Sequence, residues 1–111
     1  MELEIAIDRT DEGCVLTLSG EVDLYTAPNL KQAIVDSVDD GCTSLVIDLE
    51  QVSFIDSSGL GVLISGLRRV KEHGGTLRLV CTRDGILKIF RITGLDKVFP
   101  VFATADEARE L

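Results

Sequence analysis

The sequence has few of the residues that enzymes and nucleic-acid-binding proteins depend on. It contains one histidine, and its 11 basic residues are outnumbered by 19 acidic ones, so the formal net charge is −8. Proteins that bind a phosphate backbone take their affinity from clustered lysine and arginine. We therefore expect no direct binding to nucleic acid.

The sequence also lacks a long apolar run and a basic N-terminal segment. No apolar run approaches the ~20 residues that a membrane-spanning helix needs. The first four residues, Met-Glu-Leu-Glu, carry none of the positive charge with which a signal peptide begins. These absences predict a cytoplasmic protein that makes no use of a membrane.

Cysteine is scarce and irregularly spaced. Cys14, Cys42 and Cys81 are odd in number, and no two of them form a CxxC pair. This spacing favours neither a disulfide framework nor a zinc site. We expect all three to be small, buried or half-buried hydrophobic residues, and we expect no metal and no other cofactor.

What the chain does contain is enough apolar material for one core. It has 111 residues, of which 45% are hydrophobic and only 5% aromatic. Chains of this length rarely divide, so residues 1–111 are expected to form a single domain packed mainly by valine, isoleucine and leucine.

One stretch, residues 45–61, organises the rest. Residues 45–49 form a nearly unbroken apolar run, which is typical of a strand covered on both faces. From residue 58 to 70 the apolar residues have helical spacing. Between the two lies a short loop with an acid, two hydroxyls and two glycines, at a helix start that favours anionic groups. The side of the helix expected to be buried consists of Leu60, Leu63, Ile64, Leu67 and Val70.

The N-terminal part of the chain predicts a hairpin followed by a helix. Apolar and polar residues alternate over residues 3–7 and again over 14–19, and the pattern breaks at residues 20–23. Thr26 is placed to cap a helix that has Pro28 in its first turn and ends at residues 39–41. Its apolar stripe is Leu30, Ala33, Ile34 and Val38.

The C-terminal part predicts two strands and two helices. The central helix ends at residues 73–75, where glycine permits a left-handed cap, and a strand follows at 76–81. This order makes the strands at 45–49 and 77–80 parallel. A short helix at 84–92, a brief edge strand at 98–102 and a capped helix from 104 to the C-terminus complete the chain. The fold class is α/β, with a mixed sheet of four to five strands, an N-terminal hairpin and about four helices packed on it; the residues expected to face inward from the helix at 84–92 are Ile86, Leu87, Ile89 and Phe90.

Three kinds of catalytic or nucleotide site do not fit the central loop. A serine hydrolase needs a histidine beside its nucleophile, but His73 lies near the far end of the same helix, roughly 24 Å from Ser57 at ~1.5 Å per residue. A phosphate-binding P-loop ends in Gly-Lys-Ser/Thr, and no lysine occurs between Lys31 and Lys71. The acidic residues are too scattered for a paired-carboxylate site.

Two interpretations of the loop at residues 56–58 remain. Asp56, Ser57 and Ser58 are all residues that cap helices, so the group is explained in part as an N-cap cluster. A helix needs only one N-cap residue, however, and a phosphorylation switch would give the additional hydroxyl groups a role. A phosphate adds about −1.5 to −2 charges where the helix tolerates them. A docked partner would meet that charge beside Asp56, and a loss of ~3 kcal/mol lowers affinity more than 100-fold.

The sequence resembles the STAS domains of bacterial anti-sigma factor antagonists. The resemblance covers nearly the whole chain and is strongest in DLEQVSFIDSSGLGVLI, residues 48–64. It is supported by GEVDLYTA at residues 20–27, by the His-Gly-Gly turn at 73–75 and by IFRITGLDKVF at 89–99.

The resemblance implies a function and a set of site residues. Such proteins bind an anti-sigma factor that is also a serine kinase of the GHKL type, and thereby free a sigma factor for transcription. The kinase phosphorylates the position that corresponds to Ser57, the phosphorylated form releases the kinase, and a PP2C-type phosphatase restores binding. The protein is then a kinase substrate and not an enzyme. The partner-binding residues implied are Asp23, Leu24, Tyr25, Thr26, Asp56, Ser57, Ser58, Gly59, Leu60 and Gly61.

Alternatives stay open for the branch of the family and for single residues. STAS domains also serve as non-phosphorylated regulatory or scaffold modules, for example in lipid-transport or stress-signalling complexes. Asp23 can be a simple turn acid, and Leu24 and Tyr25 can be core or rim residues. Asp56 either orients the serine hydroxyl or only caps the helix.

Overall fold

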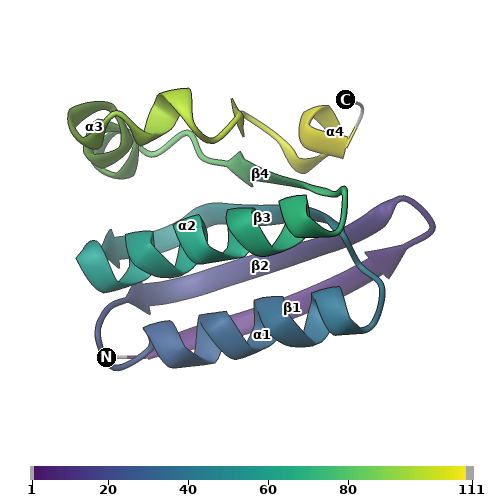
Figure 1. Ribbon diagram of the computed structural model, residues 1–111. Coiled ribbons are helices and arrows are strands. Elements are labelled where there is room, and N and C mark those ends of the chain that lie inside the picture. The colour runs from purple at the N-terminus through teal and green to yellow at the C-terminus, as the bar shows by residue number, and fades with distance from the viewer. Residues whose placement is uncertain (1, 110–111) are drawn as a thin grey trace.

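The computed structural model describes residues 2–109 and has five strands in one mixed sheet (Figure 1). The order across the sheet, β1-β2-β3-β4-β5, follows the order in the sequence. β1 and β2 form an antiparallel hairpin, and each later pair is parallel. The predicted fold class is confirmed. The strands are β1 (Leu3–Thr10), β2 (Gly13–Val22), β3 (Ser44–Ile55), β4 (Thr76–Val80) and β5 (Val101–Phe102).

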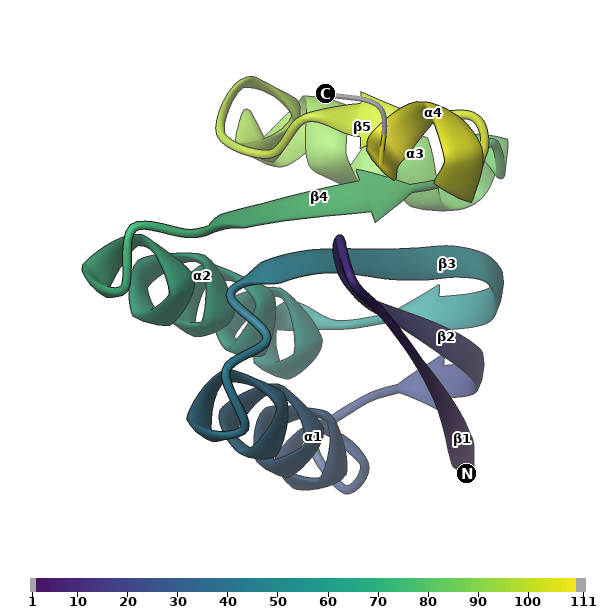
Figure 2. The same cartoon turned by 90° about the vertical axis from the view of Figure 1, so that its right-hand side faces the viewer.

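The helices cover the two faces of the sheet unequally (Figures 1 and 2). α1 (Ala27–Asp39) and α2 (Ser57–Glu72) lie side by side on one face, and α3 (Asp84–Thr93) adds its buried side chains to the same core. The short α4 (Ala105–Arg109) packs on the opposite face, and a 3-10 turn (Leu95–Lys97) follows α3.

The core follows from the alternation of side chains along the strands. Leu45, Ile47 and Leu49 of β3 point toward α1 and α2 and are fully buried, while Val46 points to the other face and packs under α4. Both faces of β3 are therefore covered, as its apolar run predicts. The other large, fully buried residues of the main core include Leu16, Leu18, Leu30, Leu63, Leu77, Leu79 and Phe90.

Two strands are longer than the sequence pattern predicts. β2 continues through residues 20–22, and β3 continues to Ile55 instead of stopping at residue 49. The parallel pairing of β2 with β3 runs from Cys14↔Leu45 to Val22↔Ile55 and contains two irregularities, one after Thr17 and one after Gly20. These irregularities shift the side-chain alternation, which is why the pattern appears to break although the backbone pairing persists.

Three predictions about helical residues need correction. Ile64 was expected on the buried side of α2 but is 37% exposed. Thr26 occupies the N-cap position of α1, yet its hydroxyl does not cap the helix. In α4, Thr104 Oγ1 accepts the predicted capping bond from Glu107 N, at 3.2 Å, but the Glu107 carboxylate reaches Ala103 N. The predicted run of this helix to the C-terminus lies outside the described residues.

The prediction that the cysteines form no disulfide is wrong. Cys14 and Cys42 are bonded to each other, with their Cα atoms 5.9 Å apart, while Cys81 is free and buried. The sequence could not reveal the pair, because 28 positions separate the two cysteines and the parallel pairing of β2 with β3, which places Cys14 opposite Leu45, brings them together. Within residues 2–109, no helix is long and apolar enough to cross a membrane.

Candidate functional site

The candidate site lies where β2 and β3 end, at the same edge of the sheet. The paired residues Val22 and Ile55 are the last of their strands, and Asp56 N donates a hydrogen bond to Val22 O at 3.1 Å. The loop of residues 23–26, which leads to α1, therefore lies against the start of α2. Two segments more than 30 positions apart meet at the carboxyl ends of parallel strands, where α/β proteins commonly bind their ligands.

Asp56 joins these two segments through both of its carboxylate oxygens. Oδ1 accepts from Ser58 N at 2.9 Å and from Gly59 N at 3.2 Å, which makes Asp56 the N-cap of α2. Oδ2 accepts from Leu24 N at 3.2 Å. Asp56 thus caps α2 and also holds the backbone of the neighbouring loop in place.

Asp23 and Thr26 build the loop from within. Both are 4% exposed. Asp23 Oδ1 accepts from Tyr25 N at 2.8 Å and from Thr26 N at 3.0 Å. Thr26 Oγ1 accepts from Asp23 N at 2.9 Å and donates to Glu21 O at 2.7 Å, which explains why this hydroxyl does not cap α1. Their side chains therefore shape the loop and face away from any docked partner.

The second oxygen of Asp23 has no hydrogen-bond partner among the described residues. Oδ2 is buried, whereas Oδ1 carries the bonds of the turn. Leaving a buried acceptor unpaired is unfavourable by about 1–3 kcal/mol. This unpaired oxygen lies in the loop that packs against the start of α2.

Leu24 and Tyr25 project outward from this rigid loop. Leu24 is 65% exposed and Tyr25 is 81% exposed, although both are large residues that normally pack inside a protein. Asp23 and Asp56 hold the backbone of both residues, so their side chains are presented outward in a fixed position. Together they form an exposed apolar patch, and tyrosine is enriched at protein-binding surfaces.

Ser57 is exposed and is the first residue of α2. Because Asp56 already caps the helix, the hydroxyls of Ser57 and Ser58 make no hydrogen bond within residues 2–109. Of the three capping-type residues, only Asp56 caps the helix, and the exposed Ser57 hydroxyl is available for modification. A phosphate on it would lie at the positive end of the helix dipole.

The next residues, Gly59 and Leu60, are buried and hold the start of α2 against the sheet. A Cβ atom added at Gly59 would lie 2.6 Å from Val22 Cγ1 and 2.8 Å from Ile55 Cγ1. At Gly61 the same atom would meet nothing within 4 Å. Gly61 lies one turn after Ser57 and faces outward with it.

The structure thus divides the predicted partner-binding residues into two groups. Asp23, Thr26, Gly59 and Leu60 are buried and position the site, and Asp56 and Ser58 are partly buried. The exposed residues form an outward surface that we name the switch face: Leu24, Tyr25, Ser57 and Gly61.

Sequence reasoning missed two apolar residues beside the switch face. Ile64 is exposed and lies seven positions after Ser57, or about two turns further along the same side of α2. That spacing from Ser57 was the signal that could have identified it. Phe54, near the end of β3, is 44% exposed and lines a hollow of about 420 Å³ between the end of β3 and the start of α3.

The site has no catalytic base or metal centre within the described part of the chain. His73 Nδ1 bonds to Arg69 O at the far end of α2, so it does not approach Ser57. No group of three metal-ligating side chains occurs in residues 2–109. What the site offers is a free hydroxyl at a helix start, surrounded by fixed apolar side chains.

Comparison with known proteins identifies the relatives of this chain. A model of the STAS domain family matches residues 4–108. The chain is 31% identical over 106 residues to an anti-sigma-B factor antagonist of Bacillus subtilis (strain 168), and the match covers 96% of each protein.

Solved structures show the same fold. The crystal structure of an anti-sigma factor antagonist from Mycobacterium paratuberculosis matches with a TM-score of 0.88 and 34% identity, over 96% of this chain and 91% of that one. The structure of the Bacillus cell fate determinant SpoIIAA in the phosphorylated form matches with a TM-score of 0.74 and 27% identity, over 96% and 97% of the two chains.

Proposed function

The chain belongs to the STAS domain family, and from this we propose that it is an anti-sigma factor antagonist whose partner binding is switched off by phosphorylation of Ser57. Its partner is an anti-sigma factor that is also a serine kinase of the GHKL type, and a PP2C-type phosphatase restores the unphosphorylated form. The protein acts in the cytoplasm as a kinase substrate and not as an enzyme.

The observation that carries this proposal is the exposed, unbonded hydroxyl of Ser57 beside Asp56. Asp56 supplies the helix cap and the bond to Leu24 N. Among residues 2–109, the side chain of Ser57 makes no hydrogen bond. A kinase can therefore modify Ser57 without breaking a contact that holds the site together. The relative solved in a phosphorylated form, at 27% identity, supports the same chemistry.

Electrostatics give the reason for release. Phosphorylation adds about −1.5 to −2 charges and three acceptor oxygens to a surface that already carries Asp56. The helix dipole stabilises this charge, so the fold survives. A partner docked over Leu24 and Tyr25 must desolvate the new charge or place its own acidic groups beside it, which favours dissociation.

The partner surface extends beyond the switch serine. Ile64 continues the exposed side of α2, and the hollow beside Phe54 adjoins the end of β3. We assign Leu24 and Tyr25 as the anchors, because they are the large apolar side chains held out by the braced loop. Ile64 and Phe54 form the surrounding contacts.

Phosphorylation by the partner tests the proposal directly. The protein is incubated with its anti-sigma factor kinase partner and with ATP, and the modified residue is mapped by mass spectrometry. We expect one phosphate on Ser57 in the wild-type protein and in Ser58→Ala. Phosphate on another residue would reject the assignment.

Calorimetry then tests the switch itself. We expect Ser57→Ala to bind the kinase with wild-type affinity and to stay bound in ATP, and Ser57→Asp to bind at least ten-fold more weakly. Ser58→Asp is the matched control, since it adds the same charge one residue further on, at a half-buried position. Equal affinities of Ser57→Ala and Ser57→Asp would contradict release by charge and favour a non-phosphorylated regulatory module.

A further inference from the structure

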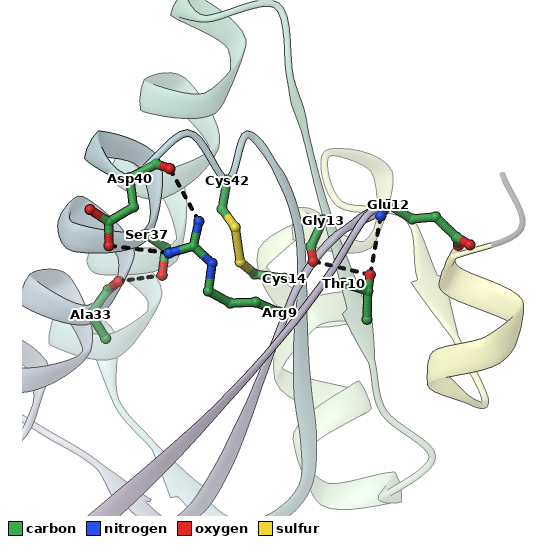
Figure 3. The surroundings of a disulfide bond; sticks show 9 residues. All are labelled: Arg9, Thr10, Glu12, Gly13, Cys14, Ala33, Ser37, Asp40 and Cys42. Carbon is green, nitrogen blue, oxygen red and sulfur yellow. Dashed lines mark hydrogen bonds and ion pairs between the residues drawn. A yellow bond between two sulfur atoms is a disulfide. The ribbon is translucent and has the colours of Figure 1, made fainter.

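The Cys14–Cys42 bond lies at the amino end of the parallel β2–β3 pair, whereas the switch face lies at its carboxyl end. Cys14 is the second residue of β2, and Cys42 lies in the loop between α1 and β3. Figure 3 shows the bond crossing from the strand to that loop. β2 separates Cys14 from Val22 by eight residues at ~3.3 Å each, so about 25 Å lie between the disulfide and the switch.

An ionic contact holds the same loop to the hairpin. Arg9 Nη1 bonds to Asp40 Oδ2 at 3.3 Å and Nη2 bonds to Asp40 O at 3.1 Å, next to the disulfide (Figure 3). Both side chains are more than half exposed, so this contact is weak by itself. The disulfide is therefore the dominant tie between the loop at residues 40–43 and the hairpin.

The position of the pair allows small reagents to reach it. The cysteines are 2% and 6% exposed, but Cys14 lies near the start of β2, next to the β1–β2 turn, and Cys42 lies in a loop, next to the exposed Gly41. Ends of strands and loops open locally far more often than the centre of a sheet. We expect opening of this loop, which breaks the hydrogen bond from Thr76 N to Thr43 O (2.9 Å), to expose the disulfide to small reagents.

We propose that Cys14 and Cys42 are a reversible redox pair that sets the stability of the fold and leaves the switch face unchanged. Disulfides in the cytoplasm are usually transient, because glutathione keeps thiols reduced. The redox proposal therefore rests on the cytoplasmic location that is part of the proposed function. Oxidation makes the fold harder to unfold, so the protein persists longer under oxidising conditions.

The chemistry is exchange with a small-molecule disulfide such as glutathione disulfide. One cysteine thiolate attacks glutathione disulfide, forms a mixed disulfide and releases one glutathione. The second cysteine then attacks the mixed disulfide, forms the Cys14–Cys42 bond and releases the other glutathione. Two electrons pass to glutathione disulfide, and the two thiol protons of the cysteines end on the two glutathione molecules.

Cys81 serves as the internal reference for this reaction. Burial raises the pKa of the Cys81 thiol, and its Sγ donates to Arg83 O at 3.8 Å. A buried thiol with a raised pKa has little of the reactive thiolate form at neutral pH. We expect Cys81 to stay reduced whenever the pair is oxidised.

The test equilibrates the intact protein with glutathione at a reducing and at an oxidising ratio, alkylates all free thiols in denaturant so that the buried Cys81 also reacts, and counts the labels by mass spectrometry. We expect three labelled cysteines at the reducing ratio and only Cys81 at the oxidising ratio. For a cross-link that spans 28 positions, the chain-entropy model gives an unfolding equilibrium constant a few hundred-fold smaller in the oxidised form, measured by urea titration. Iodide quenching of Tyr25, the only tyrosine, should be the same in both forms.

Variants distinguish the pair from other thiol effects. Cys42→Ala should have the same unfolding constant at both ratios, close to that of the reduced wild type, and Cys14→Ala serves if Cys42→Ala does not fold. Cys81→Ala should keep the full redox dependence. The same number of labelled cysteines at both ratios, whether three or one, would contradict reversible oxidation. Equal unfolding constants at the two ratios would contradict stabilisation by the disulfide. A change in Tyr25 quenching would show that oxidation also alters the switch face. None of these measurements involves the anti-sigma factor, so a failed kinase assay leaves them standing.

Discussion

The two ends of the parallel β2–β3 pair are held together in different ways. At the carboxyl end, two aspartates hold the backbone of residues 23–26 and of the α2 start, and large side chains remain exposed. At the amino end, a buried disulfide and an exposed ion pair tie a loop to the hairpin. The first end is built to present a surface and the second to resist unfolding. This difference predicts that the exposed side chains at the carboxyl end affect binding, whereas the buried residues there and the contacts at the amino end affect stability.

At the carboxyl end, the largest effect on stability is expected from Gly59→Ala. The added Cβ would overlap Val22 and Ile55 side chains and lie 3.1 Å from Val22 O, so α2 must move away from the sheet. Overpacking of this kind destabilises by about 1–3 kcal/mol and occasionally more. We expect a loss of about 3 kcal/mol in urea unfolding.

Gly61→Ala is the matched control in the same helix turn. It meets open space, and replacing a helical glycine by alanine stabilises by about 0.5–1 kcal/mol. If both variants were equally stable, close packing at Gly59 would not be what fixes the start of α2.

Asp56→Ala should have the next largest effect, because one side chain serves two segments. It removes the cap of α2, worth about 1 kcal/mol, and the acceptor of Leu24 N–H, worth a similar amount. We expect about 2 kcal/mol less stability, together with increased iodide quenching or hydrogen exchange at residues 24–25.

Asp56→Asn separates the two roles, since an amide oxygen can still cap α2 while its nitrogen cannot accept from Leu24 N. We expect Asp56→Asn to recover about half of the stability that Asp56→Ala loses. Hydrogen exchange at the Leu24 amide should stay as fast as in Asp56→Ala. Full recovery of both quantities would show that the bond to Leu24 contributes nothing.

The sequence predicts the carboxyl end far better than the amino end, for a physical reason. At the carboxyl end the important residues are consecutive: Asp56, Ser57 and Ser58 follow one another, and capping is a local interaction that the residue types reveal. The resemblance to the STAS family added the loop of residues 23–26, but neither source indicated that Asp23 and Thr26 are buried. That burial depends on how the two loops pack.

The amino end depends on long-range pairing, which the residue pattern does not encode. Cys14 and Cys42 can form a bond because β2 pairs with β3 and places Cys14 opposite Leu45. The irregularities in the same pairing hide the true length of both strands. Ile64 was misassigned because an apolar residue at helical spacing is usually buried. Its exposure instead continues the surface on which Ser57 lies.

Tyr25→Ala should change binding without changing stability. The Tyr25 side chain is 81% exposed and only its backbone N–H is held, by Asp23. Substitutions at such positions are usually within about ±0.5 kcal/mol in stability. If Tyr25 anchors the partner, its loss should lower affinity at least ten-fold, or about 1.4 kcal/mol, by calorimetry.

Ile92→Ala is the control for the loss of an exposed apolar side chain, because Ile92 is 74% exposed on α3 and outside the switch face. We expect it to leave the affinity unchanged. Equal losses from Tyr25→Ala and Ile92→Ala would indicate that the partner covers α3 as well, and the switch face would then be too narrowly defined.

The smallest effect is expected at the amino end, from Arg9→Ala in the oxidised protein. The guanidinium and the Asp40 carboxylate are 53% and 64% exposed, and exposed ion pairs contribute about 0–1 kcal/mol because water and salt screen them. With Cys14 bonded to Cys42, the loop is already fixed, so we expect a loss below about 0.5 kcal/mol that disappears in 1 M salt. In Cys42→Ala the ion pair is the remaining side-chain tie described between this loop and the hairpin, so the same substitution should have a larger effect there. Additive effects in the double variant would show that the two ties act on separate parts of the loop.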